Sequence, residues 1–188
     1  MLGAADPLPR RPHRILVAGV TGAGKTTLAA RIADLTGSPH TEIDALYHGP
    51  GWTYRESFLD EVEELASRPD WVTEWQYRSA RPTLAAHADL LVWLDLPARV
   101  ALTRLIRRTV RRRLRREVLW NGNVEGPLWG FFTGRDHILR WALRTQRKYK
   151  QTIPALESAA PHLVVVRLAS PADVERWLAG PLATAVHR

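Results

Sequence analysis

Cysteine is absent from the 188 residues of this chain. Its absence excludes disulfide bonds, thiolate-bound zinc, iron–sulfur clusters and cysteine nucleophiles. Long apolar runs are missing as well: no stretch of about 18 apolar residues could cross a bilayer, and the first 14 residues lack the apolar segment of a signal peptide. We therefore expect a cytoplasmic protein with no membrane partner.

Lysine is nearly as scarce, with Lys25, Lys148 and Lys150 the only three among 27 basic residues. Arginine therefore carries most of the positive charge, and 19 acidic residues leave a formal net charge of +8. Guanidinium groups bind phosphates and carboxylates through paired hydrogen bonds, so this composition indicates an anionic ligand. A hydrophobic content of 45% is sufficient for a folded core in one domain.

The apolar pattern predicts strands that alternate with helices. We expect residues 1–13, which contain three prolines, to form a flexible N-terminal tail, and residues 14–188 to form a single domain. Strands are predicted at 15–18, 40–43, 71–73, 90–94 and 163–168. Helices are predicted at 28–35, 56–66, 98–116, 136–152 and 170–178, with Gly180 as the last stop and a Gly/Asn/Pro-rich loop or lid at 120–134. This alternation is typical of an α/β protein with a mainly parallel sheet.

A phosphate-binding motif lies between the first predicted strand and the first predicted helix. Residues 19–26 read GVTGAGKT, which matches G-x-x-x-x-G-K-[ST]. Glycines at these positions let successive backbone N–H groups converge on phosphate oxygens, and the following helix adds its positive end. The alternative is a glycine-rich turn that happens to precede a helix. We interpret the motif as a binding site for ATP or GTP.

Each residue of this motif has an expected role. The Lys25 side chain would reach the β- and γ-phosphates and act in catalysis, and the Thr26 hydroxyl would bind Mg²⁺. Thr27 is a further candidate for nucleotide contact, with a place on the helix surface or in the core as its alternative. The other candidate nucleotide-binding residues are those of the loop itself: Gly19, Thr21, Gly22, Ala23 and Gly24.

Five segments taken together resemble the adenylate-kinase-like nucleoside monophosphate kinases, and most closely their small branch of DNA topology modulation, or FlaR-like, proteins. The segments are GVTGAGKTTLA, IDALYHGPGW, WVTEWQY, ADLLVWLDLP and WNGN. The resemblance covers about residues 14–180. It implies a P-loop NTPase fold with a five-stranded parallel sheet, helices on both faces, an acceptor-binding segment after the second strand and an arginine-rich lid at about residues 107–135.

Three carboxylates are candidates for metal binding or proton transfer. Glu74 ends the third predicted strand and is our choice as the metal-side acid that accompanies Thr26. Asp95 ends the fourth predicted strand, and an N-cap of the following helix is the alternative to a metal role for it. Asp44 lies in the segment where the resemblance implies the phosphoryl acceptor, so it could bind or deprotonate a hydroxyl as a catalytic residue. A turn-forming aspartate is its alternative.

Arginines dominate one face of the predicted helix 98–116. They fall within about 100° of arc and comprise Arg104, Arg107, Arg108, Arg111 and Arg115. The resemblance to nucleotide kinases implies that Arg104 lies near the adenine and that Arg108 acts on the phosphates during catalysis. Three interpretations remain open: a catalytic lid, a nucleic-acid-binding surface and a solvated basic face. Spacing alone does not decide which of Arg135, Arg140 and Arg144 could close the site from the other side.

We therefore predict an enzyme, a P-loop kinase that uses ATP and Mg²⁺ to phosphorylate a small-molecule acceptor, with a nucleotide as one candidate. Two proteins of other classes remain as alternatives: a nucleic-acid-associated ATPase that uses the arginine helix, and a nucleotide-binding regulator without turnover. The motifs identify neither the acceptor nor the oligomeric state, because neither pocket shape nor an interface is encoded in them.

Overall fold

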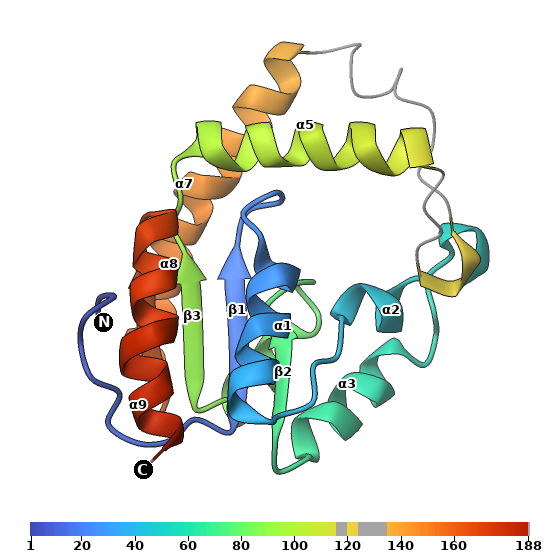
Figure 1. The fold of residues 1–188 in the computed structure, drawn as a ribbon. Coiled ribbons are helices and arrows are strands. Elements are labelled where there is room, and N and C mark those ends of the chain that lie inside the picture. The colour runs from blue at the N-terminus through green and yellow to red at the C-terminus, as the bar shows by residue number, and fades with distance from the viewer. Residues whose placement is uncertain (116–119, 124–134, 188) are drawn as a thin grey trace.

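Four parallel strands form one sheet in the order β2-β1-β3-β4 within the part of the chain that the computed structural model describes. That part covers residues 1–115, 120–123 and 135–187, without the side chains at 109, 112–115 and 135–145. The strands run side by side with β1 near the middle (Figure 1). They are β1 (Arg14–Gly19), β2 (Trp71–Glu74), β3 (Leu90–Leu94) and β4 (Val164–Leu168).

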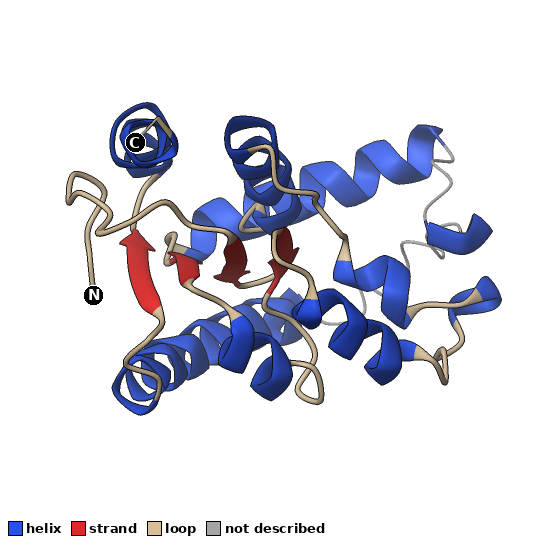
Figure 2. Cartoon of the chain, turned by 90° about the horizontal axis from the view of Figure 1, so that it is seen from below, coloured by secondary structure: helices blue, strands red, loops and turns tan. Residues whose placement is uncertain are grey.

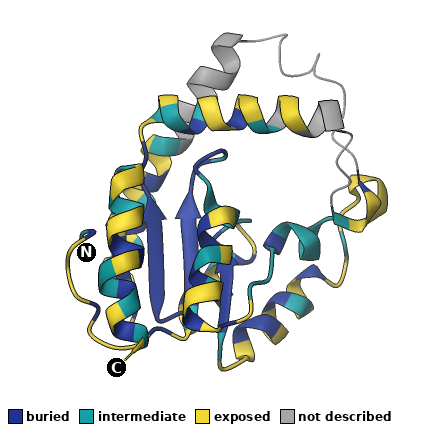
Figure 3. Ribbon diagram, in the orientation of Figure 1, coloured by how far each residue is buried: buried dark blue, intermediate teal, exposed yellow. Residues whose placement is uncertain are grey.

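The strands are apolar because helices cover the sheet on both faces. β2 and β3 are buried throughout, and β1 is buried after its first residue (Figure 3). In β1 and β3 the buried positions form continuous apolar runs, as expected of strands that meet water on neither face. The register places Ile15 between Val72 of β2 and Leu90 of β3, so β1 lies in the centre of the core.

Helices form a layer on each side of the sheet (Figure 2). One layer holds α1 (Lys25–Thr36), α8 (Pro171–Trp177) and α9 (Ala183–Val186). The other holds α4 (Arg81–His87) and α7 (Arg135–Ala159), with α3 (Phe58–Ser67) packed beside α4. Within the described ranges, no helix is long and apolar enough to span a membrane.

Helix α5 (Ala98–Arg115) crosses over the carboxyl ends of the strands (Figure 1). Its first turns touch the loop that follows β1: a Cβ atom on Gly22 would lie 2.2 Å from the carbonyl oxygen of Ala101. Gly22 also has a φ of +83°, which glycine adopts without strain. Two short elements, α2 (Ile43–Tyr47) and the 3₁₀ turn η1 (Pro50–Trp52), lie at the β2 side, where a second 3₁₀ turn, η2 (Trp120–Gly122), contacts both.

The five-stranded sheet implied by the resemblance is corrected to four strands in the described residues. The predicted strand 40–43 is reduced to a single bridge between His40 and Val72. The pairing stops there because the backbone turns into α2 at Ile43, whose N–H donates to the Glu74 side chain instead of to a neighbouring strand.

The segment 1–13, for which we expected a flexible tail, lies against the open edge of β4. The Leu2 N–H donates to the Val165 oxygen at 2.8 Å, and the Leu2 oxygen accepts from the Arg167 N–H at 2.8 Å. Ala4 and Leu8 are buried in the core. The prolines prevent a helix here, as expected, but the apolar residues between them gain enough burial to hold the segment in place.

The predicted helix stop at Gly180 is also wrong. The chain passes through a wide π-type turn, η3 (Leu178–Leu182), and continues into α9. Leu178, Leu182 and Ala185 are buried, so packing against the core outweighs the helix-breaking tendency of Gly180 and Pro181. Most of the expected lid, residues 116–119 and 124–134, lies outside the described residues.

Candidate active site

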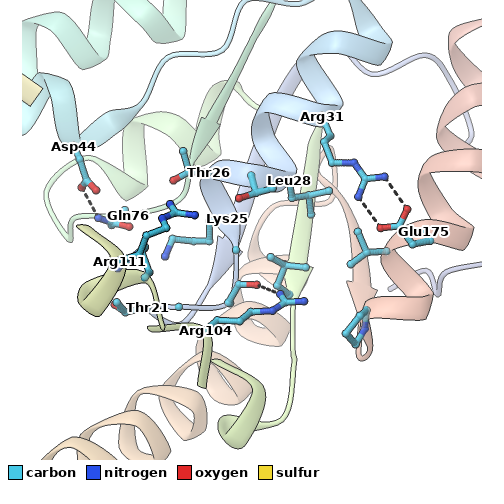
Figure 4. Close-up of a pocket in the computed structure, with 18 residues that line it drawn as sticks. Thr21, Lys25, Thr26, Leu28, Arg31, Asp44, Gln76, Arg104, Arg111 and Glu175 are labelled. Carbon is cyan, nitrogen blue, oxygen red and sulfur yellow. Dashed lines mark hydrogen bonds and ion pairs between the residues drawn. The ribbon is translucent and has the colours of Figure 1, made fainter. Parts of the chain in front are cut away.

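A cavity of about 520 Å³ lies between the loop after β1, the start of α1, helix α5 and the start of α8 (Figure 4). It opens at the carboxyl ends of parallel strands, where α/β sheets bind their ligands. Its lining consists of Thr21, Gly22, Ala23, Gly24, Lys25, Thr26, Thr27, Leu28, Arg31, Asp44, Gln76, Leu94, Arg104, Arg108, Arg111, Pro171, Val174 and Glu175.

The phosphate-binding motif forms the floor of this cavity. Gly24 has a φ of +99° and is followed at once by α1, so the backbone turns sharply and the first N–H groups of the helix face the cavity. All the motif residues predicted to bind nucleotide line the cavity except Gly19. A Cβ atom on Gly19 would lie 3.1 Å from the Leu94 Cβ, so this glycine allows the loop to pack on β3.

Lys25 is the cation at the centre of the cavity floor. Burial lowers its pKa to about 8, even though the carboxylates of Asp44 and Glu74 act to raise it. The positive charges of Arg108 and Arg81 lower the pKa further. A cation that has lost water and faces other cations gains strongly from an anion, so the site favours phosphate groups beside Lys25.

Glu74 is buried at the end of β2, and the Thr26 hydroxyl lies close enough to help lower its pKa. Burial alone would raise the pKa of Glu74, but hydrogen bonds from His40, the Ile43 N–H and the Thr26 hydroxyl outweigh it and lower the pKa overall. The Ile43 N–H lies 3.1 Å from Oε2, and the His40 Nε2 lies 3.3 Å from Oε1. Glu74 is therefore an ionised carboxylate beside the motif hydroxyl.

This pair of oxygen donors fits Mg²⁺. Magnesium is usually held by one or two carboxylate or hydroxyl groups together with phosphate oxygens and water, not by a cage of protein ligands alone. The residues that the structure describes contain no group of three or more histidine, aspartate or glutamate side chains able to hold a metal ion. Thr26 and Glu74 are thus the residues that would hold Mg²⁺ on the protein side.

Asp95, the competing acid, has a different partner. Its Oδ2 accepts from Arg167 Nε at 2.9 Å and from Arg167 Nη2 at 2.6 Å. The same guanidinium group lies over the Trp93 ring, 5.4 Å from its centroid. Neither Asp95 nor Glu74 lines the cavity, so their partners distinguish them: the ion pair with Arg167 favours a structural role for Asp95.

The two acids should therefore respond differently to neutralisation. Glu74→Gln is expected to raise the Mg²⁺ concentration needed for half-maximal turnover by about tenfold or more, since a carboxylate near the ion is lost. Asp95→Asn should leave that concentration unchanged and lower the melting temperature, because Arg167 loses its charged partner. Titration of turnover with Mg²⁺, with thermal melts of both variants, makes the comparison. If Asp95→Asn raised the required Mg²⁺ concentration more than Glu74→Gln did, the metal would be assigned to Asp95.

Asp44 lies at the opposite end of the cavity from α8, beside Gln76 (Figure 4). Its Oδ1 accepts hydrogen bonds of 2.6 Å from Gln76 Nε2 and 2.6 Å from the Tyr77 hydroxyl. Sequence reasoning selected Asp44 but gave no role to Gln76 or Tyr77. The segment WVTEWQY contains both, so the residues just after β2 were the available signal.

The arginines of α5 divide between cavity and solvent. Arg104, Arg108 and Arg111 line the cavity, and Arg104 Nη1 donates to the Ala23 oxygen of the loop at 2.9 Å. Arg107 is exposed and does not line it. The side chains of Arg115, Arg135, Arg140 and Arg144 lie outside the described residues.

The WNGN segment, residues 120–123, contacts α2, η1 and the residues beside them. Trp120 Nε1 donates to Glu42 Oε2 at 2.8 Å. Asn123 is buried, accepts from the Trp52 N–H at 3.0 Å and donates to the Gly49 oxygen at 2.9 Å. These contacts fasten the segment that follows α5 to the segment that carries Asp44. In the sequence, WNGN was notable only as one of the five segments that carry the resemblance. The sequence did not indicate which residues these four contact.

The sequence analysis also did not predict the end of the cavity beside α8. Arg31 of α1 and Glu175 of α8 form a two-pronged ion pair with distances of 2.6 and 2.7 Å. Pro171 and Val174 complete this wall. The only signal for it was general: Pro171 follows the last strand, and the carboxyl ends of parallel strands meet at one edge.

Comparison with known proteins agrees with the fold. No protein-family model matches this chain, and no curated protein matches it in sequence. A gluconokinase from Sinorhizobium meliloti 1021 matches in structure with 26% identity and a TM-score of 0.52, over 95% of this chain and 96% of that one. A shikimate kinase from Acinetobacter baumannii, in complex with shikimate, shares the fold at 18% identity and a TM-score of 0.51, over 93% and 89% of the two chains.

A shikimate kinase from Bacteroides thetaiotaomicron shares the fold as well, at 16% identity and a TM-score of 0.52, over 89% of this chain and 95% of that one. The phosphate-binding loop and cavity described above, together with the gluconokinase similarity, define the class: the chain is a P-loop kinase. None of the three neighbours is an adenylate kinase or a topology modulation protein, so the finer branch stays a prediction.

Proposed function

We propose that this kinase transfers the γ-phosphoryl group of ATP, together with Mg²⁺, to a hydroxyl group of a small polar acceptor. One observation carries the proposal: a carboxylate, Asp44, lines the same cavity as Lys25 and the phosphate-binding loop. A phosphate-binding floor with a hydrogen-bonded carboxylate at one end is what transfer to a hydroxyl requires.

The nucleotide occupies the part of the cavity between the loop and α8. The loop N–H groups and Lys25 bind the phosphates, and Arg104 with Pro171 and Val174 provides the walls for the base. Thr26 and Glu74 would hold Mg²⁺, which would supply neutralisation of phosphate charge and make the γ-phosphorus more electrophilic.

The acceptor hydroxyl binds at Asp44. As its oxygen forms a bond to the γ-phosphorus, the bond between that phosphorus and the bridging oxygen of ADP breaks, and the hydroxyl proton moves to the Asp44 carboxylate. Lys25 and Arg108 neutralise the charge that spreads over the transferring group. After the products leave, Asp44 returns its proton to solvent.

A polyhydroxylated acid is the acceptor class that the comparisons favour. The gluconokinase similarity extends over nearly the whole of both chains at 26% identity. The cavity also presents Arg111, whose guanidinium group suits a carboxylate, and Gln76, whose amide suits hydroxyls. The resemblance to nucleoside monophosphate kinases supports a nucleoside monophosphate as the second candidate.

An acceptor screen tests the proposal. The purified protein with ATP and Mg²⁺ is offered gluconate, other sugar acids, neutral sugars, shikimate, nucleosides and nucleoside monophosphates, with ADP release and product mass measured. We expect ADP release that depends on a hydroxylated acceptor and is fastest with a sugar acid. A response to nucleoside monophosphates alone would replace the acceptor class. ATP binding without release of ADP under any condition would overturn the proposed activity.

The α5 arginines give a prediction that separates catalysis from nucleic-acid binding. Arg108→Ala should lower phosphoryl transfer by about tenfold or more, as expected for the loss of one donor to the transferring group, and Arg104→Ala should mainly weaken ATP binding. Arg107→Ala on the same helix is the matched control and should do neither.

Turnover, ATP affinity and DNA affinity are measured on all three variants. A nucleic-acid surface would instead make each substitution weaken DNA binding similarly and reduce its salt dependence by about one phosphate contact. Equal and small losses of turnover across the three would exclude the catalytic assignment of Arg108.

A further inference from the structure

Asp44 is the end of a hydrogen-bonded chain that runs away from the cavity. The Tyr77 hydroxyl lies 2.6 Å from Asp44 Oδ1 and 3.1 Å from His48 Nε2. Gln76 Nε2 also donates to Oδ1, at 2.6 Å. Among the residues that the structure describes, the bonds to the Asp44 carboxylate all end on this one oxygen.

The number of protons on each group determines which atom donates in each of these hydrogen bonds. A tyrosine hydroxyl has one proton, and an ionised carboxylate can only accept, so the Tyr77 hydroxyl donates to Asp44. Its oxygen then accepts from His48, which must carry its proton on Nε2. Burial and the hydrogen bond to Asp44 both raise the pKa of Tyr77, so the hydroxyl keeps its proton.

The Tyr77 ring is held rigidly by its neighbours. It stacks on Tyr47 with the centroids 3.8 Å apart and the planes at 7°, and it meets the Phe58 ring edge-on at 5.4 Å. The Tyr77 backbone has a φ of +53°, in the left-handed region that costs free energy for a residue with a side chain. Strain of this kind persists where the surroundings fix the residue, and it gathers at functional sites.

We infer that Tyr77 and Gln76 are positioning residues that hold Asp44 Oδ1, so that Oδ2 is the oxygen that receives the proton of the acceptor hydroxyl, and that His48 sets the direction of the Tyr77 hydroxyl. The inference rests on the proposed function, because it assigns the geometry of the same proton transfer. Two short bonds on Oδ1 leave that oxygen the poorer base. They also hold the Asp44 side chain in one rotamer. Its Oδ2 is therefore already oriented toward the acceptor hydroxyl.

Tyr77→Phe tests this inference, because it keeps the stacked ring and removes only the hydroxyl. We expect kcat to fall about tenfold or more, as for the loss of a hydrogen bond to a charged group, while the KM for ATP and the melting curve change little. Tyr54→Phe is the matched control, since Tyr54 belongs to the same aromatic cluster but is half exposed.

Two further comparisons show whether Tyr77 acts through Asp44. In an Asp44→Ala background, Tyr77→Phe should cause no additional loss of kcat. His48→Gln, which places an amide N–H near the original Nε2, should keep more activity than His48→Leu. Wild-type turnover together with a Tyr77→Phe variant as active as Tyr54→Phe overturns the inference alone. Absence of acceptor-dependent turnover in the wild type overturns the proposed function and this inference with it.

Discussion

Lys25→Ala is expected to lower the rate of phosphoryl transfer by about a hundred- to a thousandfold, the loss typical for one pre-positioned charge at a transferring group. The side chain lines the cavity, where burial and neighbouring cations lower its pKa, so its contribution appears when phosphate is bound. The fold should remain, because α1 begins with backbone contacts that alanine preserves. Steady-state turnover, ATP affinity and circular dichroism of the purified variant check the prediction.

Because the pKa of Lys25 is lowered, we expect kcat/KM for ATP to depend on pH near that value. Below about pH 8 the free enzyme carries the positive charge on Lys25, and above it the charge is lost. The kcat/KM for ATP should therefore fall as the pH rises through about 8 in the wild type, with this limb missing in Lys25→Ala. Lys148→Ala, an exposed lysine on α7, is the control and should match the wild type. Unchanged turnover in Lys25→Ala would remove the loop from the mechanism.

Asp44→Asn is the second substitution for which we expect a large effect. The amide keeps the size of the side chain and can still accept from Tyr77, but it cannot take up a proton, so kcat should fall by about a hundredfold or more. ATP binding should change little, because Asp44 lies at the far end of the cavity from α8. Single-turnover kinetics with saturating ATP measure the transfer step.

Asp60→Asn is the matched control for Asp44→Asn. Asp60 is an exposed aspartate of α3 outside the cavity lining, so its neutralisation should leave the transfer rate nearly unchanged. If Asp44→Asn retained most of the wild-type rate, Asp44 would be a turn residue and the base would have to be sought elsewhere.

The parts of the site that the sequence predicts are those whose signal is local. The motif from Gly19 to Thr26 is continuous in the chain. Glu74 ends a short β-prone segment, and Asp95 follows the continuous apolar run that predicts a buried strand. The structure then separates the two acids through their partners. Glu74 meets Thr26, whereas Asp95 meets Arg167, and these partners come from strands and helices whose order in space no periodicity encodes.

The parts that the sequence does not predict depend on contacts across the fold. His48, Tyr77 and Asp44 lie in two segments about 30 residues apart and meet only because α2 packs beside the end of β2. The missing fifth strand has a similar cause, since the Ile43 N–H finds a buried carboxylate in place of a strand partner. At both termini, burial of Leu2, Leu8 and Leu182 overrides the breaking signals of proline and glycine.

Each pairing in the parallel sheet closes a long segment of chain: Arg14 pairs with Trp71, Ile15 with Leu90, and Leu90 with Val164. A ribosome that adds about 5 to 20 residues per second leaves the apolar strand β1 without its first strand neighbour for roughly 3 to 10 s, and β3 waits about as long again for β4. During synthesis the unpaired edges of both strands are exposed to other chains. The nascent protein is therefore at greatest risk of aggregation before Leu168 has left the ribosome, and a chaperone that shields β1 and β3 from other chains should improve its yield.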